Sequence, residues 1–187
     1  QEMLRQHPNI QGDLLEFRGM LECEAASLAA RRATDADLQR IDEAFARVEA
    51  LFAQGTSAEV LEQQVKADLA FHQAIAEAAH NVMFGHLTAS LFRVINDHID
   101  RNLRHLRRTE DDWKELRDQH RAIWEGVRSR DPALASAAVR RHIDFVSESM
   151  VARARHEERE TRARVARSLV RSAPLKGEAA EVESGSQ

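Results

Sequence analysis

Hydrophobic residues recur every three or four positions along this chain, which is the spacing that places side chains on one face of a helix. Leu14, Leu21, Ala25 and Leu28 fall on one such stripe, and comparable stripes follow one another as far as residue 150 or so. Short polar stretches separate the stripes. We therefore expect consecutive amphipathic helices over about 11–32, 35–53, 58–79, 82–106 and 110–129, and a sixth helix that begins near 132 and runs past 150.

Polar residues at the breaks predict where helices begin and end. Thr34 precedes the second helix and Asp37 follows three residues later, which is the spacing of a capping box. Asp131 is followed by Pro132, and this pair predicts a new helix start because proline fits the first helical position. Asn81 tolerates the left-handed conformation, so we expect it to end the third helix.

The composition agrees with an all-helical domain. The 187 residues include 7 Gly, 3 Pro and no Tyr, a mixture that favours helices over sheets. We expect an all-α fold, an antiparallel bundle of about six or seven helices. No apolar run approaches the ~18 residues of a membrane span, so we expect no membrane partner. The single cysteine, Cys23, fits a reducing compartment, which indicates a cytoplasmic protein. The net charge of −4 argues against general nucleic-acid binding by this chain.

The third predicted helix carries an acid and an imidazole among its apolar residues. Asp68 and His72 stand one turn apart on the stripe that also holds Leu61, Val65 and Ile75. A stripe of this kind faces the core of a bundle. Because burial of an unpaired carboxylate is costly, Asp68 needs a partner inside the protein.

Two more histidines lie on the apolar stripes of the last two helices. His120 precedes the turn by about ten residues and His142 follows it by about eleven, so at ~1.5 Å per residue both lie roughly 15 Å from it. In an antiparallel hairpin they meet at one level. With Asp68 and His72 they make four candidate ligands for a divalent metal ion. One oxygen and three nitrogens suit Zn first, and also Ni, Mn, Fe or Co, and they leave coordination positions open for water or a small anion.

Two alternatives to a metal site that binds a small anion stay open at this point. A histidine that faces the core is more often hydrogen-bonded than metal-bound, so the same residues fit a metal-free structural or dimerisation module. A metal with open positions can also activate water, as in a small helical hydrolase. The chain has no HExxH motif, and Glu22 is the one further acid on the inward stripes that could act as a base. We therefore expect no enzymatic activity.

The first predicted helix places a charge on its inward face. Arg18 lies on the stripe between Leu14 and Leu21, with Glu22 one turn further on. The guanidinium stays protonated at any physiological pH, so it requires an anion. Either Glu22 supplies that anion in an internal ion pair, or Arg18 receives a carboxylate ligand through its two parallel N–H groups.

Three stretches carry a resemblance to a known family: "DLLEFRGMLECEAASLAARRAT", "DLAFHQAIAEAAHN" and "QHRAIWEGVRSRDPALASAAVRRHIDF". They resemble the effector-binding C-terminal (FCD) domain of the FadR-type branch of the GntR transcription regulators, over roughly 11–150. "LLEFR" is most similar to members that sense lactate, glycolate or pyruvate. The resemblance implies a divalent metal held by Asp68, His72, His120 and His142, with Arg18 contacting a small carboxylate effector. The fatty-acyl-binding branch lacks this metal set, so we do not expect a long acyl effector.

The resemblance also predicts how the chain is organised. Family members carry an N-terminal winged helix-turn-helix domain, whereas only "QEMLRQHPNI" precedes the first helix here. We expect 1–10 to be the remnant of a linker from such a domain, 11–155 to be the effector-binding bundle, and 156–187 to be a charged helix extension with a disordered tail. Binding to operator DNA would then belong to the full-length regulator, which the resemblance predicts to be a homodimer.

Overall fold

The computed structural model describes the backbone of residues 10–54, 58–106 and 110–172. It does not describe all of their side chains: those left out are at 10–11, 95–106, 153–158, 168–172 and a few single positions. All the regular structure within these ranges is α-helical, which confirms the predicted all-α fold. The observed helix bounds agree with the predicted ones to within a residue. The helices are α2 (Ile10–Arg32), α3 (Asp35–Phe52), α4 (Ala58–Ala78), α5 (Val82–Leu106), α6 (Glu110–Arg128) and α7 (Pro132–Ser172).

Two compact units make up the chain, Gln1–Val151 and Ala152–Gln187. The first contains α2 to α6 and the N-terminal part of α7, and it holds the functional site. In the second unit, the side chains described at 159–165 and 167 are exposed, which is typical of a solvated, charged helix. Among the helices that the structure describes, none is both long enough and apolar enough to cross a membrane.

The caps predicted at two helix starts are confirmed. The Thr34 hydroxyl accepts a hydrogen bond from the Asp37 N–H (3.2 Å), and the Asp37 carboxylate accepts one from the Thr34 N–H (2.8 Å). At the start of α7, Asp131 Oδ1 accepts from the N–H groups of Ala133 and Leu134, each at 3.0 Å. A cap of this kind stabilises a helix by ~1 kcal/mol. These contacts fix the residues at which α3 and α7 begin.

The end of α4 differs from the prediction. His80, and not Asn81, takes the left-handed conformation, with φ of 49°. Asn81 instead directly precedes α5, and its side-chain oxygen accepts from the Met83 N–H in the first turn at 3.1 Å. The physical reason is tertiary: His80 Nε2 lies 2.6 Å from a carboxylate oxygen of Asp37, and this contact compensates for the less favourable backbone angle.

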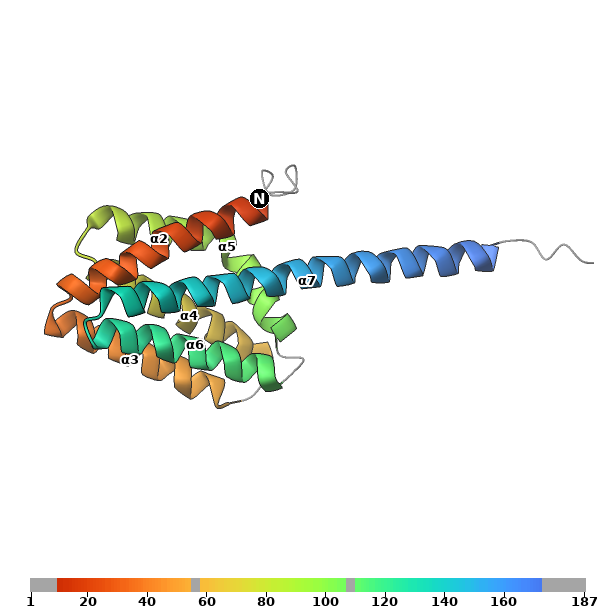
Figure 1. Cartoon of the computed structure of the whole chain (residues 1–187). Coiled ribbons are helices and arrows are strands. Elements are labelled where there is room, and N and C mark those ends of the chain that lie inside the picture. Colours follow the sequence, from red (N-terminus) through yellow and green to blue (C-terminus); the bar gives the residue numbers. More distant parts are fainter. Residues whose placement is uncertain (1–9, 55–57, 107–109, 173–187) are drawn as a thin grey trace, which may run out of the picture. The chain divides into compact units, whose positions relative to one another are not determined.

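Helix α4 packs against α2, α3 and α5 (Figure 1). Its Phe71 is fully buried. Two stacked aromatic pairs join α3 to α6: Phe45 lies on Trp124 with ring centroids 4.9 Å apart, and Phe52 lies on Trp113 at 4.2 Å. Aromatic pairs add ~0.5–1.5 kcal/mol each beyond the area they bury. These contacts hold the helices that carry the site in a fixed arrangement.

The α6–α7 hairpin brings two backbones very close together. A Cβ added at Gly126 would lie 2.6 Å from the Cα of Ala135, so this crossing requires glycine. Arg130, with φ of 57°, makes the left-handed turn that ends α6. The hairpin places the rings of His120 and His142 with their centroids 4.7 Å apart. The two histidines therefore meet at one level, as the count of residues from the turn predicted.

Candidate metal centre

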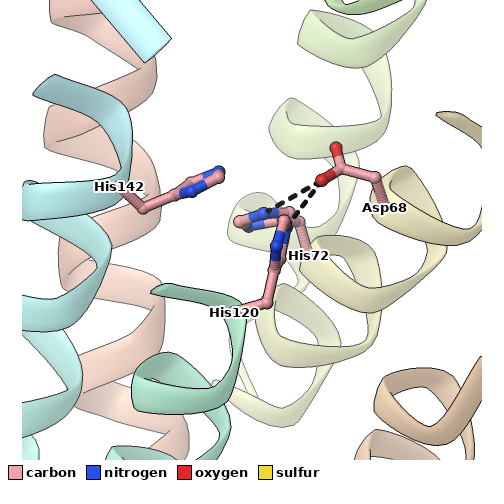
Figure 2. A group of neighbouring side chains, drawn as sticks. All are labelled: Asp68, His72, His120 and His142. Carbon is pink, nitrogen blue, oxygen red and sulfur yellow. Dashed lines mark hydrogen bonds and ion pairs between the residues drawn. The ribbon is translucent and has the colours of Figure 1, made fainter. Parts of the chain in front are cut away.

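Four polar side chains from three helices meet inside the bundle. Asp68 and His72 come from α4, His120 from α6 and His142 from α7, and Figure 2 shows them converging on one small region. All four are buried, with at most 4% of any residue exposed. One donor atom from each can be chosen so that all of these atoms lie within 4.8 Å of one another. The structure thus brings together the four residues that the sequence singled out.

The separation of these donor atoms fits a single metal ion. Bonds of ~2.0–2.2 Å to nitrogen and oxygen allow two ligand atoms on opposite sides of an ion to be at most about 4.4 Å apart. The observed limit of 4.8 Å is only slightly larger, so small side-chain rotations would suffice to close the shell around one ion. The donor set could therefore hold a divalent cation through one oxygen and three nitrogens.

Both ring nitrogens of His120 face oxygen acceptors. The Leu116 carbonyl can only accept, so His120 Nδ1, 2.9 Å away, must donate to it. On a neutral ring, Nε2 then carries the lone pair, yet it lies 2.7 Å from Asp68 Oδ1, which is also an acceptor. Two acceptors at this distance repel each other unless a proton or a metal ion lies between or beside them. A metal ion would use both atoms as neighbouring ligands.

His142 is held in the form that can bind a metal. Its Nδ1 lies 3.2 Å from Gln119 Oε1, and the amide of Gln119 is oriented by a hydrogen bond from its Nε2 to Glu115 Oε1 (2.8 Å). Nδ1 is therefore the donor, and the Nε2 lone pair remains for a ligand bond. Burial lowers the pKa of His142, and nearby His120, His72 and Arg18 lower it further, well below its usual range. The ring is accordingly neutral at neutral pH.

His72 contacts a second buried carboxylate. Its Nδ1 lies 2.7 Å from Glu22 Oε2, while its Nε2 is buried without a hydrogen bond and lies 4.0 Å from Asp68 Oδ1. The contact with Glu22 is short but imperfectly aligned, since Oε2 has no hydrogen bond of good geometry. A carboxylate beside the remote nitrogen of a histidine is the usual partner of a metal-binding imidazole.

Arg18 makes the internal ion pair that the sequence left as one of two alternatives. Its Nε donates to Glu22 Oε1 at 2.5 Å, so the internal ion pair is present. Its Nη2 is nevertheless buried without a hydrogen-bond partner. The guanidinium carbon lies 5.6 Å from the centre of the Phe92 ring, which in turn lies 6.3 Å from the His72 ring. The Nη2 amino group of Arg18 is thus left to donate to a further acceptor.

The two buried acids of the site are ionised. Burial raises the pKa of Asp68, but the hydrogen bond and charge of His120, with His72 and Arg18, outweigh it and hold that pKa well below its usual range. Burial likewise raises the pKa of Glu22, but the charges of Arg18 and His72, together with the hydrogen bond from Arg18, bring it below its ordinary value. The site therefore offers anionic oxygens together with a neutral imidazole, as a divalent ion requires.

Two of these contacts were not predicted from the sequence. Glu22 was expected beside Arg18 but not against His72, and Gln119 was not among the candidate residues. A signal for Gln119 was present, because it follows Leu116 by three residues and so lies on the same inward face of α6. No pattern in the sequence links Glu22 to His72, which lies on a different helix.

The fold and the site together define a helical domain with a buried Asp/His cluster that could hold a metal ion. Comparison with known proteins agrees with this class. The profile of the FCD domain matches residues 13–145. The chain therefore belongs to the FCD domain family, the effector-binding type of domain found in GntR-family transcription regulators, as its resemblance predicted.

Known relatives are transcription regulators. The chain is 33% identical over 143 residues to the HTH-type transcriptional regulator LutR of Bacillus subtilis (strain 168), covering 72% of this chain and 59% of the relative. It is 28% identical over 148 residues to the putative L-lactate dehydrogenase operon regulatory protein of Escherichia coli (strain K12), covering 79% and 54%. It is 31% identical over 139 residues to the Glc operon transcriptional activator of the same strain, covering 74% and 54%.

A solved structure described as Streptococcus agalactiae GntR is also similar, with a TM-score of 0.57 and 27% sequence identity, over 73% of this chain and 57% of that one. The chain thus spans between half and two thirds of the length of the proteins it matches. Its similarity to them concerns the sensor bundle and not the remainder of those proteins.

Proposed function

We propose that this chain is the sensor domain of a bacterial GntR/FadR-type regulator. In this proposal Asp68, His72, His120 and His142 hold a divalent metal ion, with zinc as the first choice and Ni, Mn, Fe or Co as alternatives. A small carboxylate of the lactate, glycolate or pyruvate class binds beside the metal and contacts Arg18. Effector binding then controls how the full-length protein, a homodimer, binds operator DNA through its N-terminal domain.

The buried charges carry the proposal of a monocarboxylate. Metal ligation requires the three imidazoles to be neutral, so among the described residues the charged groups of the metal-bound site would be Arg18, Glu22 and Asp68, which together carry one negative charge. A divalent cation changes this to one positive charge. One monoanion would then make the buried centre neutral, and a neutral centre has the lowest free-energy cost of removing charges from water. A dicarboxylate would leave an excess negative charge in the core.

The unpaired Nη2 of Arg18 supports the place of the carboxylate. A buried N–H donor without a partner costs ~1–3 kcal/mol, and an effector oxygen would satisfy it. Glu22 already holds the Nε side of the same guanidinium, so Arg18 is preorganised for a second anion. When bound, the metal would supply a second, Lewis-acidic contact for the effector. The name of the E. coli relative, a putative L-lactate dehydrogenase operon regulatory protein, agrees with an effector of this class.

Signalling requires that the effector bind one packing of the helices better than another. The site draws ligands from α4, α6 and α7, and Arg18 adds α2, so a bound effector would tie four helices together. A ligand can shift an equilibrium only by the difference between its affinities for the two arrangements. This difference would alter the relative positions of the two DNA-binding domains in the dimer.

The hydrolase alternative has little support in the site. Besides Asp68, the described buried acids are Glu22 and Asp37. Glu22 is engaged by Arg18 and His72, and Asp37 caps α3. A general base would need a free carboxylate within reach of a bound water, and the described part of the chain offers none. The similar proteins of known role are regulators, which agrees with a binding function.

Calorimetry on metal-loaded protein tests the proposal. L-lactate, glycolate and pyruvate are titrated into the zinc-loaded chain, with succinate as the dicarboxylate control. We expect at least one monocarboxylate to bind more tightly than succinate. We also expect the binding heat to vanish in a His72→Ala, His120→Ala double variant. Unchanged heats in that variant, or zinc bound at less than about a tenth of an ion per chain after loading, would reject the proposal in favour of a metal-free module.

A further inference from the structure

We propose that Glu22 is a positioning residue that couples the metal site to the effector site. This inference rests on the proposed function, because it concerns the same metal and the same carboxylate. Glu22 is 3% exposed and sits between two functional groups. One of its oxygens lies 2.5 Å from Arg18 Nε and the other 2.7 Å from His72 Nδ1. A single carboxylate thus touches the expected effector contact and one expected metal ligand.

The first consequence concerns His72. A carboxylate oxygen accepts and cannot donate, so it favours the form of His72 that carries its proton on Nδ1. In this form the lone pair is on Nε2, which is buried without a partner, and the His72 ring is stacked against that of His142 at 5.1 Å between centroids. Glu22 therefore selects the tautomer in which His72 can bind the metal.

The second consequence concerns Arg18. The ion pair through Nε fixes the plane of the guanidinium, and with it the direction of the unpaired Nη2. Without Glu22, this long side chain would have to be ordered by the effector itself, and that lost freedom would weaken binding. The charge on Glu22 also keeps the total charge of the site such that one cation and one monoanion neutralise it.

We expect metal binding and effector binding to be coupled because the contacts with His72 and with Arg18 are both made by the carboxylate of Glu22. A metal that fixes His72 also fixes Glu22, and Glu22 in turn fixes Arg18 for the carboxylate. Metal should therefore raise the affinity for effector, and effector should raise the affinity for metal by the same factor, since coupling between bound states is reciprocal. Replacement of Glu22 should reduce this factor as well as each separate affinity.

Glu22→Gln is the first variant, and Glu49→Gln is its matched control. Gln is the same size as Glu but can accept well from only one of the two neighbours. Glu49 forms ion pairs with Arg117 and Arg121 between α3 and α6, outside the metal cluster. Zinc affinity is measured by competition with a chromophoric chelator, and L-lactate affinity by calorimetry with and without zinc. We expect Glu22→Gln to weaken zinc binding by about 10–100-fold and to bring the coupling factor close to one, while Glu49→Gln changes neither.

The tautomer of His72 provides a readout that needs no metal. Ring ¹⁵N shifts of metal-free protein are recorded at about pH 8, above the ordinary pKa of histidine. We expect Nδ1 to be protonated in the wild type. Because Glu22→Gln leaves Arg18 without a full counter-charge and can fail to fold, an Arg18→Met, Glu22→Leu double variant replaces the whole pair with apolar groups. In this variant we expect a substantial fraction of His72 to carry its proton on Nε2.

The outcomes separate the two proposals. If the wild type binds zinc and lactate but the Glu22 variants keep the tautomer, the zinc affinity and the coupling factor, Glu22 has no positioning role and the sensor function still holds. If the wild type binds no zinc, the sensor proposal fails, and the tautomer alone decides whether Glu22 orients His72. A wild-type His72 protonated on Nε2 would overturn the inference in either case.

Discussion

Replacing Gln119 with leucine tests how the protein prepares His142 for a metal. Gln119 Oε1 accepts from His142 Nδ1 at 3.2 Å, and Glu115 holds the amide in place. Leucine fills the same space but leaves the Nδ1–H unsatisfied and the ring free to turn. Loss of such a contact reduces metal affinity by about 10–100-fold, or ~1.4–2.7 kcal/mol. Because 3.2 Å is near the long limit of a hydrogen bond, we expect a value close to tenfold.

Gln64→Leu is the control for this change. Gln64 is as buried as Gln119, at 1% exposed, and its amide donates to the Leu51 carbonyl at 2.6 Å. It lies one turn before Asp68 on α4, so it is close to the cluster. Each variant removes a buried side-chain hydrogen bond and should lose roughly 1 kcal/mol of folding free energy. Only Gln119→Leu should also lose metal affinity.

The assay is chelator competition for zinc, with thermal unfolding of the metal-free proteins recorded alongside. A domain of this size shifts its Tm by roughly 2–4 °C per kcal/mol, so both variants should unfold a few degrees below the wild type. Equal loss of zinc affinity in the two variants would mean that general destabilisation, and not orientation of His142, governs binding. Full zinc affinity in Gln119→Leu would refute the role of Gln119.

Three further predictions concern stability. Gly126→Ala should lower the free energy of unfolding by ~1–3 kcal/mol, because the added Cβ would lie 2.6 Å from the backbone of α7. Thermal unfolding should therefore show a lower Tm. Gly12→Ala is the control: its Cβ meets nothing within 4 Å, so it should not lower the Tm. Burial raises the pKa of Asp37, but hydrogen bonds from Thr34 and His80 outweigh it and lower that pKa to about 2. The ionised form of Asp37 therefore stabilises the fold above the ordinary pKa of an aspartate, about 3.9. The difference in unfolding free energy between the wild type and Asp37→Asn should be largest near neutral pH and should shrink as the pH falls toward 2. A difference that grows in acid would contradict this. Removal of metal by a chelator should lower the Tm by about 5–10 °C relative to protein with free zinc at 100 times its Kd, and an unchanged Tm would show that the fold does not bind the metal.

The sequence was sufficient to predict the helices and the residues that face the core. Apolar spacing indicated the inward side of each helix, and side-chain chemistry at Thr34 and Asp131 indicated where helices begin. The level of His120 and His142 followed from a count of residues along two helices of known rise. These features depend on residues that are close in sequence, or on one hairpin, so the local sequence is enough to predict them.

The contacts that orient the site could not be predicted in the same way. Glu22 and His72 lie on different helices, and only the distance between those helices determines that the side chains meet. The left-handed residue at the end of α4 is His80 because Asp37, far away in sequence, holds its ring. For Arg18 the sequence left an ion pair and a ligand contact as alternatives. In the structure, Arg18 Nε makes the ion pair with Glu22 while Nη2 stays unpaired. The spacing of residues along the chain could not predict this division.

An anomalous-scattering experiment on zinc-soaked crystals tests the central claim most directly. Data collected on both sides of the zinc edge would locate each bound ion and identify the element. We predict one strong peak inside the bundle, within ~2.0–2.2 Å of an oxygen of Asp68 and of Nε2 of His72, His120 and His142. Peaks only at exposed histidines such as His86, or none at all, would contradict the claim that these four side chains form a metal centre.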